Sequence, residues 1–253
     1  MRSNASTRVG FRLNPDPVTM PVRELLYALV AAVLIGCAKT AESATPVVAS
    51  AEAAPGTATY GPDRIAVALD TALLRKADLG RIAGDSSAKV IVLEISDFQC
   101  PYCKTFHDST YSSLRAAYID NGKARMAYVN LPLGSHKNAW PAAEAAMCSS
   151  VQGKFWPMHD SLFNAQDRWA AVTKPDTMFS RFSRTLQLDT KAYDACISAH
   201  STRPLISSDA ERASSAGING TPAFIIGDSL LAGAYPFPYF QRTIDAALAA
   251  QRR

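Results

Sequence analysis

The sequence predicts an α/β domain in which a run of helices interrupts a small sheet. A β-branched apolar run, Lys89 to Ile95, leads directly into Cys100-Pro101-Tyr102-Cys103 and a helical pattern. A second strand-like run covers Ala124 to Leu131. Helical residues follow, and then a short hairpin and a closing helix. The expected order is strand, helix, strand, helical insertion, hairpin and helix.

Length and composition restrict the class of protein. The chain has 253 residues, of which 48% are hydrophobic and 19% are charged, which is enough for one sizeable core. The net charge is only +4, and the Lys and Arg residues are spread among acidic ones. Because no basic block or stripe is present, we expect no nucleic-acid partner.

The N-terminal region predicts export. The apolar run Leu25 to Gly36 carries no charge and is too short to span a membrane comfortably. Arginines precede this run at positions 2, 8, 12 and 23, and small residues end it. This pattern is typical of a secretory signal peptide, here within residues 1–36. Either Met1 or Met20 could be the start.

The segment that follows predicts a membrane anchor and a tether. Leu34-Ile35-Gly36-Cys37 resembles a bacterial lipobox, so we expect cleavage before Cys37 and lipid modification of its thiol. The alternatives are a plain signal peptide or an uncleaved anchor, with Cys37 incidental. Residues 37–59 are rich in Ala, Thr, Ser and Pro and predict a flexible tether. The folded domain is then expected over residues 60–253.

Each expected element rests on a local pattern. Apolar residues recur at helical spacing in Asp63 to Ala77 and in Pro101 to Tyr118, and Asn121-Gly122 ends the second helix. The helical insertion is expected at about 137–217. Its breaks are predicted at Gly153, Pro157, Pro175 and Pro204.

The C-terminal part predicts a hairpin followed by a helix. Ala223 to Ile226 and Ser229 to Ala232 read as two short strands that flank a Gly227-Asp228 turn. Phe237 to Ala250 has the pattern of a closing amphipathic helix.

The cysteines divide into three groups. With Cys37 as a lipid site, the five cysteines leave the C-x-x-C pair and two more, Cys148 and Cys196. These two could form a structural disulfide in an oxidising compartment. In the chain-entropy model the bridge would stabilise the fold by about 4 kcal/mol.

The spacing of Cys100 and Cys103 predicts a reactive dithiol. At the N-terminus of a helix, free N–H groups and the helix dipole stabilise a thiolate. Such surroundings lower a cysteine pKa from roughly 8.5 to about 3.5–7.5. Pro101 suits the first helical turn. Half a zinc site is the alternative, but Cys148 and Cys196 lack the spacing for the remaining ligands, so we expect no metal.

Three segments together resemble the DsbA-like branch of the thioredoxin superfamily: VLEISDFQCPYCKTFH, QGKFWPMHDSLF and GINGTPAFIIGD. The resemblance covers roughly residues 80 to 250. It implies a thioredoxin fold with an inserted helical subdomain.

The resemblance also assigns roles to the cysteines and one acid. It implies that Cys100 is the nucleophile and the more exposed thiol, and that Cys103 is the buried resolving thiol. Glu94 would be a buried acid that exchanges protons with Cys103. From the residues alone, Glu94 could instead lie at a frayed strand end or pair with Lys89.

A proline loop completes the implied site. The resemblance implies a cis Thr221-Pro222 bond that faces the two thiols. The backbone of Thr221 would pair with an extended client segment, and the loop would block metal access. Pro101 and Tyr102 would tune the nucleophile and adjoin the client. An aromatic and apolar cluster at helical spacing could line a client groove, although core packing is the simpler expectation; its members are Phe155, Trp156, His159, Leu162 and Phe163.

These observations predict an exported, lipid-anchored thiol–disulfide oxidoreductase in the periplasm or cell envelope. Its simplest function would be to donate disulfides to reduced or misoxidised exported proteins. It would need no cofactor, but it would need a membrane partner, either a quinone-linked oxidase or an electron donor. The alternatives are a disulfide reductase, an isomerase, a copper(I) metallochaperone and a client-binding chaperone. Only Tyr60 to Leu79 lie before the core, too few for the dimerisation domain of an isomerase, so we expect a monomer.

Overall fold

The computed structural model describes residues 70–251. The expected signal peptide, Cys37, the tether and the start of the helix predicted from Asp63 lie outside the described residues. Within the described part, no helix is both long enough and apolar enough to cross a membrane.

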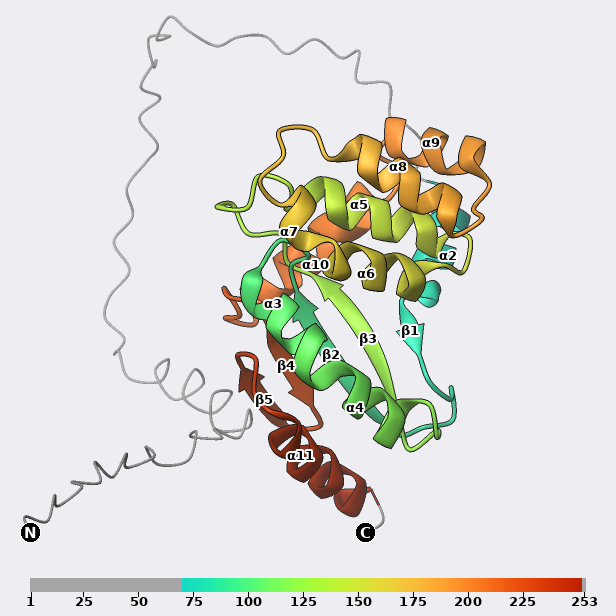
Figure 1. Ribbon diagram of the computed structural model, residues 1–253. Helices are drawn as coiled ribbons and strands as arrows, with labels where there is room; N and C mark the ends of the chain where they lie inside the picture. Colours follow the sequence, from blue (N-terminus) through green and yellow to red (C-terminus); the bar gives the residue numbers. More distant parts are fainter. Residues whose placement is uncertain (1–69, 252–253) are drawn as a thin grey trace, which may run out of the picture.

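A five-stranded sheet forms the centre of the described part (Figure 1). Its strands are β1 (Ile82–Ala83), β2 (Val90–Ser96), β3 (Ala124–Asn130), β4 (Ala223–Ile226) and β5 (Ser229–Ala232). Around them lie the helices α2 (Thr71–Gly80), α3 (Pro101–Phe106), η1 (His107–Tyr111), α4 (Ser112–Leu114), η2 (Arg115–Ile119), α5 (Ala139–Ser150), α6 (Phe155–Asn164), α7 (Gln166–Trp169), α8 (Asp176–Thr185), α9 (Thr190–Ser198), α10 (Arg203–Ser215) and α11 (Phe237–Ala250).

The strand order is β1-β3-β2-β4-β5. The central pair, β2 and β3, is parallel over its whole length, with Val90 opposite Ala124 and Ser96 opposite Asn130. β4 pairs antiparallel with β2, and the other neighbouring pairs are antiparallel too. β2 is therefore an interior strand, which explains its nearly continuous apolar sequence.

One long helix covers one face of the sheet. It begins at Pro101, ends at Ile119 and contains two π-helical turns, η1 and η2, between its α-helical parts. Its Phe106 packs against Phe224 of β4 and Phe240 of α11, with ring centres 4.5 and 5.3 Å apart. This long helix and α11 therefore share one face, while Ala213 of α10 packs with Ile95 on the opposite face.

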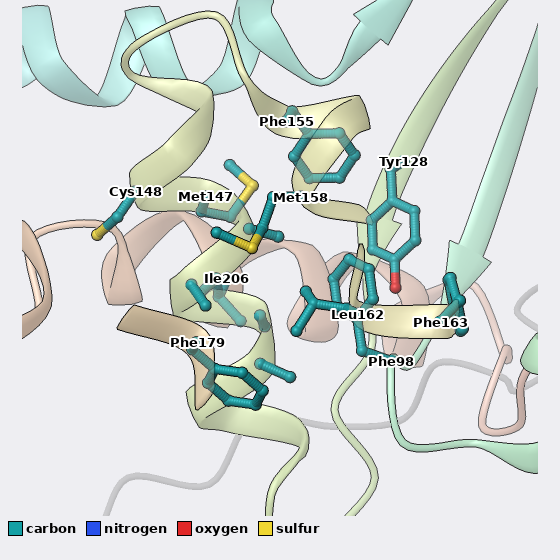
Figure 2. Close-up of a cluster of buried hydrophobic side chains, with 14 of the residues drawn as sticks. Phe98, Tyr128, Met147, Cys148, Phe155, Met158, Leu162, Phe163, Phe179 and Ile206 are labelled. Atoms are coloured by element: carbon teal, nitrogen blue, oxygen red, sulfur yellow. The ribbon is translucent and has the colours of Figure 1, made fainter. Parts of the chain in front are cut away.

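The helical insertion caps the end of the sheet at which β2 and β3 terminate (Figure 1). Its buried core joins the sheet through Phe98 and Tyr128, whose rings stack with centres 4.8 Å apart (Figure 2). Cys148 of α5 and Cys196 of α9 form a disulfide with a Cα separation of 5.8 Å. That bond links two helices of the insertion.

The observed elements depart from the predicted ones in three places. The first described helix, α2, begins at Thr71, because the Asp70 side chain accepts a hydrogen bond from the Leu73 N–H and caps the helix there. The predicted breaks at Pro157 and Pro204 are wrong. These prolines lie in the first turns of α6 and α10, where a missing N–H has no helical partner. The two-residue β1 was not predicted, since so short a strand has no pattern.

Candidate active site

The two thiols lie at the start of the long helix. Cys100 is the N-cap residue, with φ −69° and ψ 125°, and Pro101 occupies the first turn. The Cys100 carbonyl accepts the first helical hydrogen bond from the Lys104 N–H at 3.1 Å. Cys100 is 3% exposed and Cys103 is fully buried. Cys100 is therefore the more exposed of the two thiols, as expected, but the difference in exposure is small.

The surroundings of the two thiols separate their pKa values. The pKa of Cys100 is lowered to about 6, first because the Cys103 thiol donates a hydrogen bond to its thiolate. The Thr221 hydroxyl and the backbone N–H groups of Cys103 and Tyr102 add to this effect, and burial opposes it. Burial, reinforced by the Cys100 thiolate, raises the pKa of Cys103 well above its usual value. At neutral pH the pair therefore consists of a thiolate and a thiol.

Three polar side chains hold the loop that precedes Cys100. Asp97 is buried and accepts hydrogen bonds from the Gln99 N–H at 2.7 Å and the Leu133 N–H at 2.9 Å. Gln99 donates to the Ala170 carbonyl at 2.9 Å. Gln166 of α7 donates to the Cys100 carbonyl at 3.0 Å, so the helical insertion fixes the backbone of the nucleophile.

The Thr221-Pro222 peptide bond is cis, and its loop faces Cys100. The Cys100 thiol donates a hydrogen bond to the Thr221 carbonyl at 3.4 Å. A long-range contact thus joins the dithiol to the loop before β4.

A cavity of about 770 Å³ opens beside this contact. Tyr102 and Thr105 line one side, and the segments 217–223 and 230–235 line the other. Tyr102 is 67% exposed at its rim. The cavity offers mainly apolar side chains and backbone groups, as a site for an extended peptide requires.

Glu94 is fully buried on the sheet face below the long helix. It makes no ion pair with any described residue, so the alternative pairing with Lys89 is wrong, and neither carboxylate oxygen has a hydrogen-bond partner there. Burial raises the pKa of Glu94 to about 7, against a smaller opposite effect of the positive charge on His107. A carboxyl group in this state can take up and release a proton near neutral pH.

The structure brings together most of the residues singled out in the sequence. Cys100, Cys103, Tyr102, Thr221 and Pro222 meet at one end of the sheet, with Glu94 below them. Cys148 and Cys196 lie apart, in the helical insertion. Phe155 and Phe163 are core residues, not groove residues.

Sequence reasoning missed the residues that support the site. Asp97 and Gln99 stand directly after β2, where polar residues at the end of a buried strand are a signal that could have been used. Gln166 gave no signal of its own, because its role depends on a contact with a distant part of the chain.

The site combines a cysteine thiolate at a helix N-terminus, a thiol one turn later and a facing proline loop on this fold. This combination is typical of thiol–disulfide oxidoreductases and defines the class of protein. The family model described as "Thioredoxin" matches residues 76–246, more than half of the chain. The chain belongs to this thioredoxin family, and the expected DsbA-like fold with a helical insertion is confirmed.

Several known proteins are similar to this chain. "Probable disulfide bond formation protein D" of Bacillus cereus is 27% identical over 65% of this chain and 77% of its own length. The structure of alpha-DsbA1 from Wolbachia pipientis has a TM-score of 0.61 at 24% identity, and covers 67% of this chain and 91% of that one. A periplasmic thioredoxin-like protein from Salmonella enterica serovar Typhimurium has a TM-score of 0.53 at 22% identity, over 70% and 97% of the chains.

A further relative is much longer than this chain. The Na(+)/H(+) antiporter NhaA 3 of Salinispora tropica is 30% identical over 69% of this chain. The chain spans 26% of the length of that antiporter.

Proposed function

We propose that this protein donates the Cys100–Cys103 disulfide to reduced client proteins. The observation that carries the proposal is the position of Cys100 at the helix N-terminus beside the Cys103 thiol, where its pKa is lowered to about 6. A stabilised thiolate lowers the free energy of the reduced form, and a dithiol whose reduced form is stabilised has an oxidising disulfide. Because the two sulfurs are largely buried, only client thiols that enter the adjoining cavity can reach the Cys100–Cys103 disulfide.

The reaction is a pair of thiol–disulfide exchanges. A client thiolate attacks the Cys100 sulfur, the Cys100–Cys103 bond breaks, and Cys103 leaves and takes up a proton. A second client thiolate attacks the client sulfur of the mixed disulfide, and Cys100 leaves as a thiolate. The client loses two electrons and gains a disulfide, while the protein gains the two electrons as a thiol and a thiolate.

The client would lie in the cavity between Tyr102 and the Thr221-Pro222 loop. An extended segment there can pair with backbone groups next to Cys100 while its apolar side chains contact the cavity walls. Client recognition would then depend on backbone and apolar contacts more than on charge. This expectation suits a protein that acts on many unfolded or partly folded chains.

The setting of the reaction is also a proposal. The Cys148–Cys196 disulfide supports an oxidising compartment, as does the periplasmic relative. We place the protein in the periplasm or cell envelope as a monomer, anchored through lipid on Cys37. A quinone-linked membrane oxidase would restore the disulfide after each turnover. A membrane electron donor would take that role if the protein were a reductase.

The reduction potential of the Cys100–Cys103 pair tests the direction of electron flow. It is measured by equilibrating the protein with glutathione buffers and quantifying the free thiols of the pair. A value near about −120 mV is expected for a disulfide donor. A value near about −270 mV would assign the protein as a reductase, because its dithiol would then readily give up two electrons to a client disulfide.

A further inference from the structure

Glu94 has no direct access to solvent. In the proposed function Cys103 leaves and takes up a proton, and the DsbA resemblance implies that Glu94 exchanges protons with this thiol. On that basis Glu94 must regain or lose a proton in every turnover. Its side chain is 0% exposed, and it lies on the face of β2 that the long helix and α6 cover. A route for protons must therefore pass through neighbouring side chains.

Unpartnered polar atoms gather on this face of the sheet. They are both carboxylate oxygens of Glu94, Ser96 Oγ, the Tyr128 hydroxyl, Trp156 Nε1 and His159 Nε2. Tyr128 is the register partner of Glu94, and its ring centre lies 5.7 Å from that of His159. The free Nε2 of His159 thus belongs to the same buried layer as the acid. Buried polar atoms are normally paired, so a concentration of unpaired ones indicates a functional constraint.

His159 connects this layer with the surface. Its Nδ1 lies 2.8 Å from Asp160 Oδ1, and His107 Nε2 lies 3.4 Å from the same oxygen. The Asp160 carboxylate accepts the Nδ1–H bond, which leaves the His159 Nε2 lone pair facing inward. The Asp160 side chain is 44% exposed. With His107, it lines a surface hollow of about 540 Å³.

The pKa values fit this arrangement. Burial lowers the pKa of His159 to about 4, so its ring is neutral and can accept a proton only transiently. Burial raises the pKa of Asp160, but hydrogen bonds from His107 and His159 outweigh burial and hold it well below its usual range. Burial lowers the pKa of His107, but the hydrogen bonds to Asp160 and Asp108 raise it more, so the pKa of His107 lies above its ordinary value. His159, the inner group, is thus neutral, whereas His107, the outer group, readily takes up a proton.

The geometry points to His159, Asp160 and His107 as a proton relay that connects Glu94, and through it Cys103, with solvent. When Cys103 closes the disulfide, its proton passes to Glu94 and its sulfur bonds to Cys100. The bond from Cys100 to the outer thiol breaks, and that thiol leaves as a thiolate. Glu94 and His159 Nε2 share no direct hydrogen bond, so the Glu94 proton passes to His159 Nε2 through one bridging water. The Nδ1 proton then passes to Asp160, and His107 or solvent receives it. No electrons move through the relay.

Neighbouring groups around Glu94 and His159 do not offer the same route. The titratable and charged residues next to them are His107 and Tyr111 of η1, Arg115 of η2, Tyr128 of β3 and Asp160 of α6. Burial raises the pKa of Tyr111 and that of Tyr128, so both stay protonated. The Arg115 guanidinium is held by Asp120 and Tyr111.

Rapid mixing with oxidised glutathione tests the relay. The reduced protein reacts first at Cys100 to form a mixed disulfide, and Cys103 then closes the ring. Acid quenching and mass spectrometry follow the two steps separately. We expect His159→Gln and Asp160→Asn to slow ring closure about tenfold, less than the 10²–10⁴ typical of direct acid–base catalysis. The first step and the final equilibrium with glutathione should stay within about twofold of the wild type, because a relay changes rates only.

His107→Gln gives a readout that a structural role would not produce. In dilute buffer its ring closure should be slow, and added imidazole should restore the rate, because the hollow at His107 opens to solvent. The wild-type rate should not depend on imidazole. His200→Asn is the matched control, since His200 is an exposed histidine that pairs with Glu144 in the helical insertion.

The outcomes distinguish a proton relay from a purely structural role. Wild-type closure rates in both Asp160→Asn and His107→Gln would overturn the relay. Slow closure with a shifted equilibrium and no response to imidazole would assign these residues a structural role, which also overturns it. Asp160 and His107 are less buried than His159, so these variants remain informative if His159→Gln folds poorly. If the wild type forms no Cys100–Cys103 disulfide, the proposed function itself fails.

Discussion

Glu94 of β2 lies directly opposite Tyr128 of β3 in the parallel pair, and both side chains are fully buried. Neither the carboxylate nor the hydroxyl has a hydrogen-bond partner among the described residues. Burial, and then the charge of Glu94, raise the pKa of Tyr128 well above its usual value. The face of the sheet below the dithiol therefore favours neutral groups, which makes the charge on Glu94 costly.

Replacing Glu94 with Gln should change how stability depends on pH. The folded pKa of about 7 exceeds the ordinary 4.5, so the folded state binds more protons between these values. The contribution of Glu94 to the free energy of unfolding is fully present below pH 4.5 and is lost as the pH rises through 7. Relative to the wild type, Glu94→Gln should therefore gain roughly 3 kcal/mol of unfolding free energy between pH 4 and pH 8.5. Urea unfolding of both proteins at the two pH values measures this gain, and equal differences at both would contradict it.

Removing the Cys103 thiol should raise the pKa of Cys100. The hydrogen bond from Cys103 is the largest cause of the lowered value, so Cys103→Ala removes the main stabilisation of the thiolate. Cys103→Ser keeps a donor at the same position and should raise the pKa less. Thiolate absorbance against pH gives both values. A pKa that stays at about 6 in Cys103→Ala would show that the helix terminus and Thr221 suffice.

Removing the disulfide of the helical insertion should weaken the fold and spare the redox reaction. The bond joins residues 48 positions apart, and in the chain-entropy model its loss costs about 4 kcal/mol. We expect Cys148→Ala/Cys196→Ala to lose about this free energy of unfolding in urea. Its equilibrium with glutathione should match the wild type. A changed equilibrium would mean that the insertion, through Gln166, transmits the change to Cys100.

Replacing Asp209 should destabilise the fold because it removes the buried partner of the Arg81 guanidinium and leaves only the half-exposed Asp78 beside that cation. Asp209 is fully buried, pairs with Arg81, and accepts hydrogen bonds from the backbone and side chain of Asn130 at 3.1 and 2.9 Å. We expect Asp209→Ala to lose about 3–5 kcal/mol of unfolding free energy. The double variant Arg81→Met/Asp209→Leu should lose much less, because no charge stays buried. Similar losses in both would argue that the Asn130 bonds dominate.

The hairpin and the closing helix were predicted to the residue. Strands 223–226 and 229–232 and helix 237–250 have strong local signals, namely β-branched or apolar runs, a Gly227-Asp228 turn and prolines at the helix start. The breaks in the helical insertion were predicted less well. Proline disfavours a helix interior but suits its first turn, and only the position of the helix start decides which applies, as at Pro157.

The residues of the candidate site also divide into those that local sequence patterns predicted and those that they did not. The sequence by itself determined the reactive pair, because the spacing of Cys100 and Cys103 after a strand and before a helix is a local pattern. It also marked Glu94, since a charge within an apolar strand is conspicuous. The pairing of Cys148 with Cys196 was only one possibility in the sequence, because cysteine counts do not fix connectivity.

Only the tertiary structure decided how these groups act. The lowered pKa of Cys100, the neutral state favoured at Glu94 and the link from His159 through Asp160 to His107 depend on burial and on contacts between residues far apart in the chain. A side chain's protonation depends on the dielectric and the charges around it, and folding alone brings these together. The chemical groups are thus written in the sequence, whereas their protonation states and the route to solvent belong to the fold.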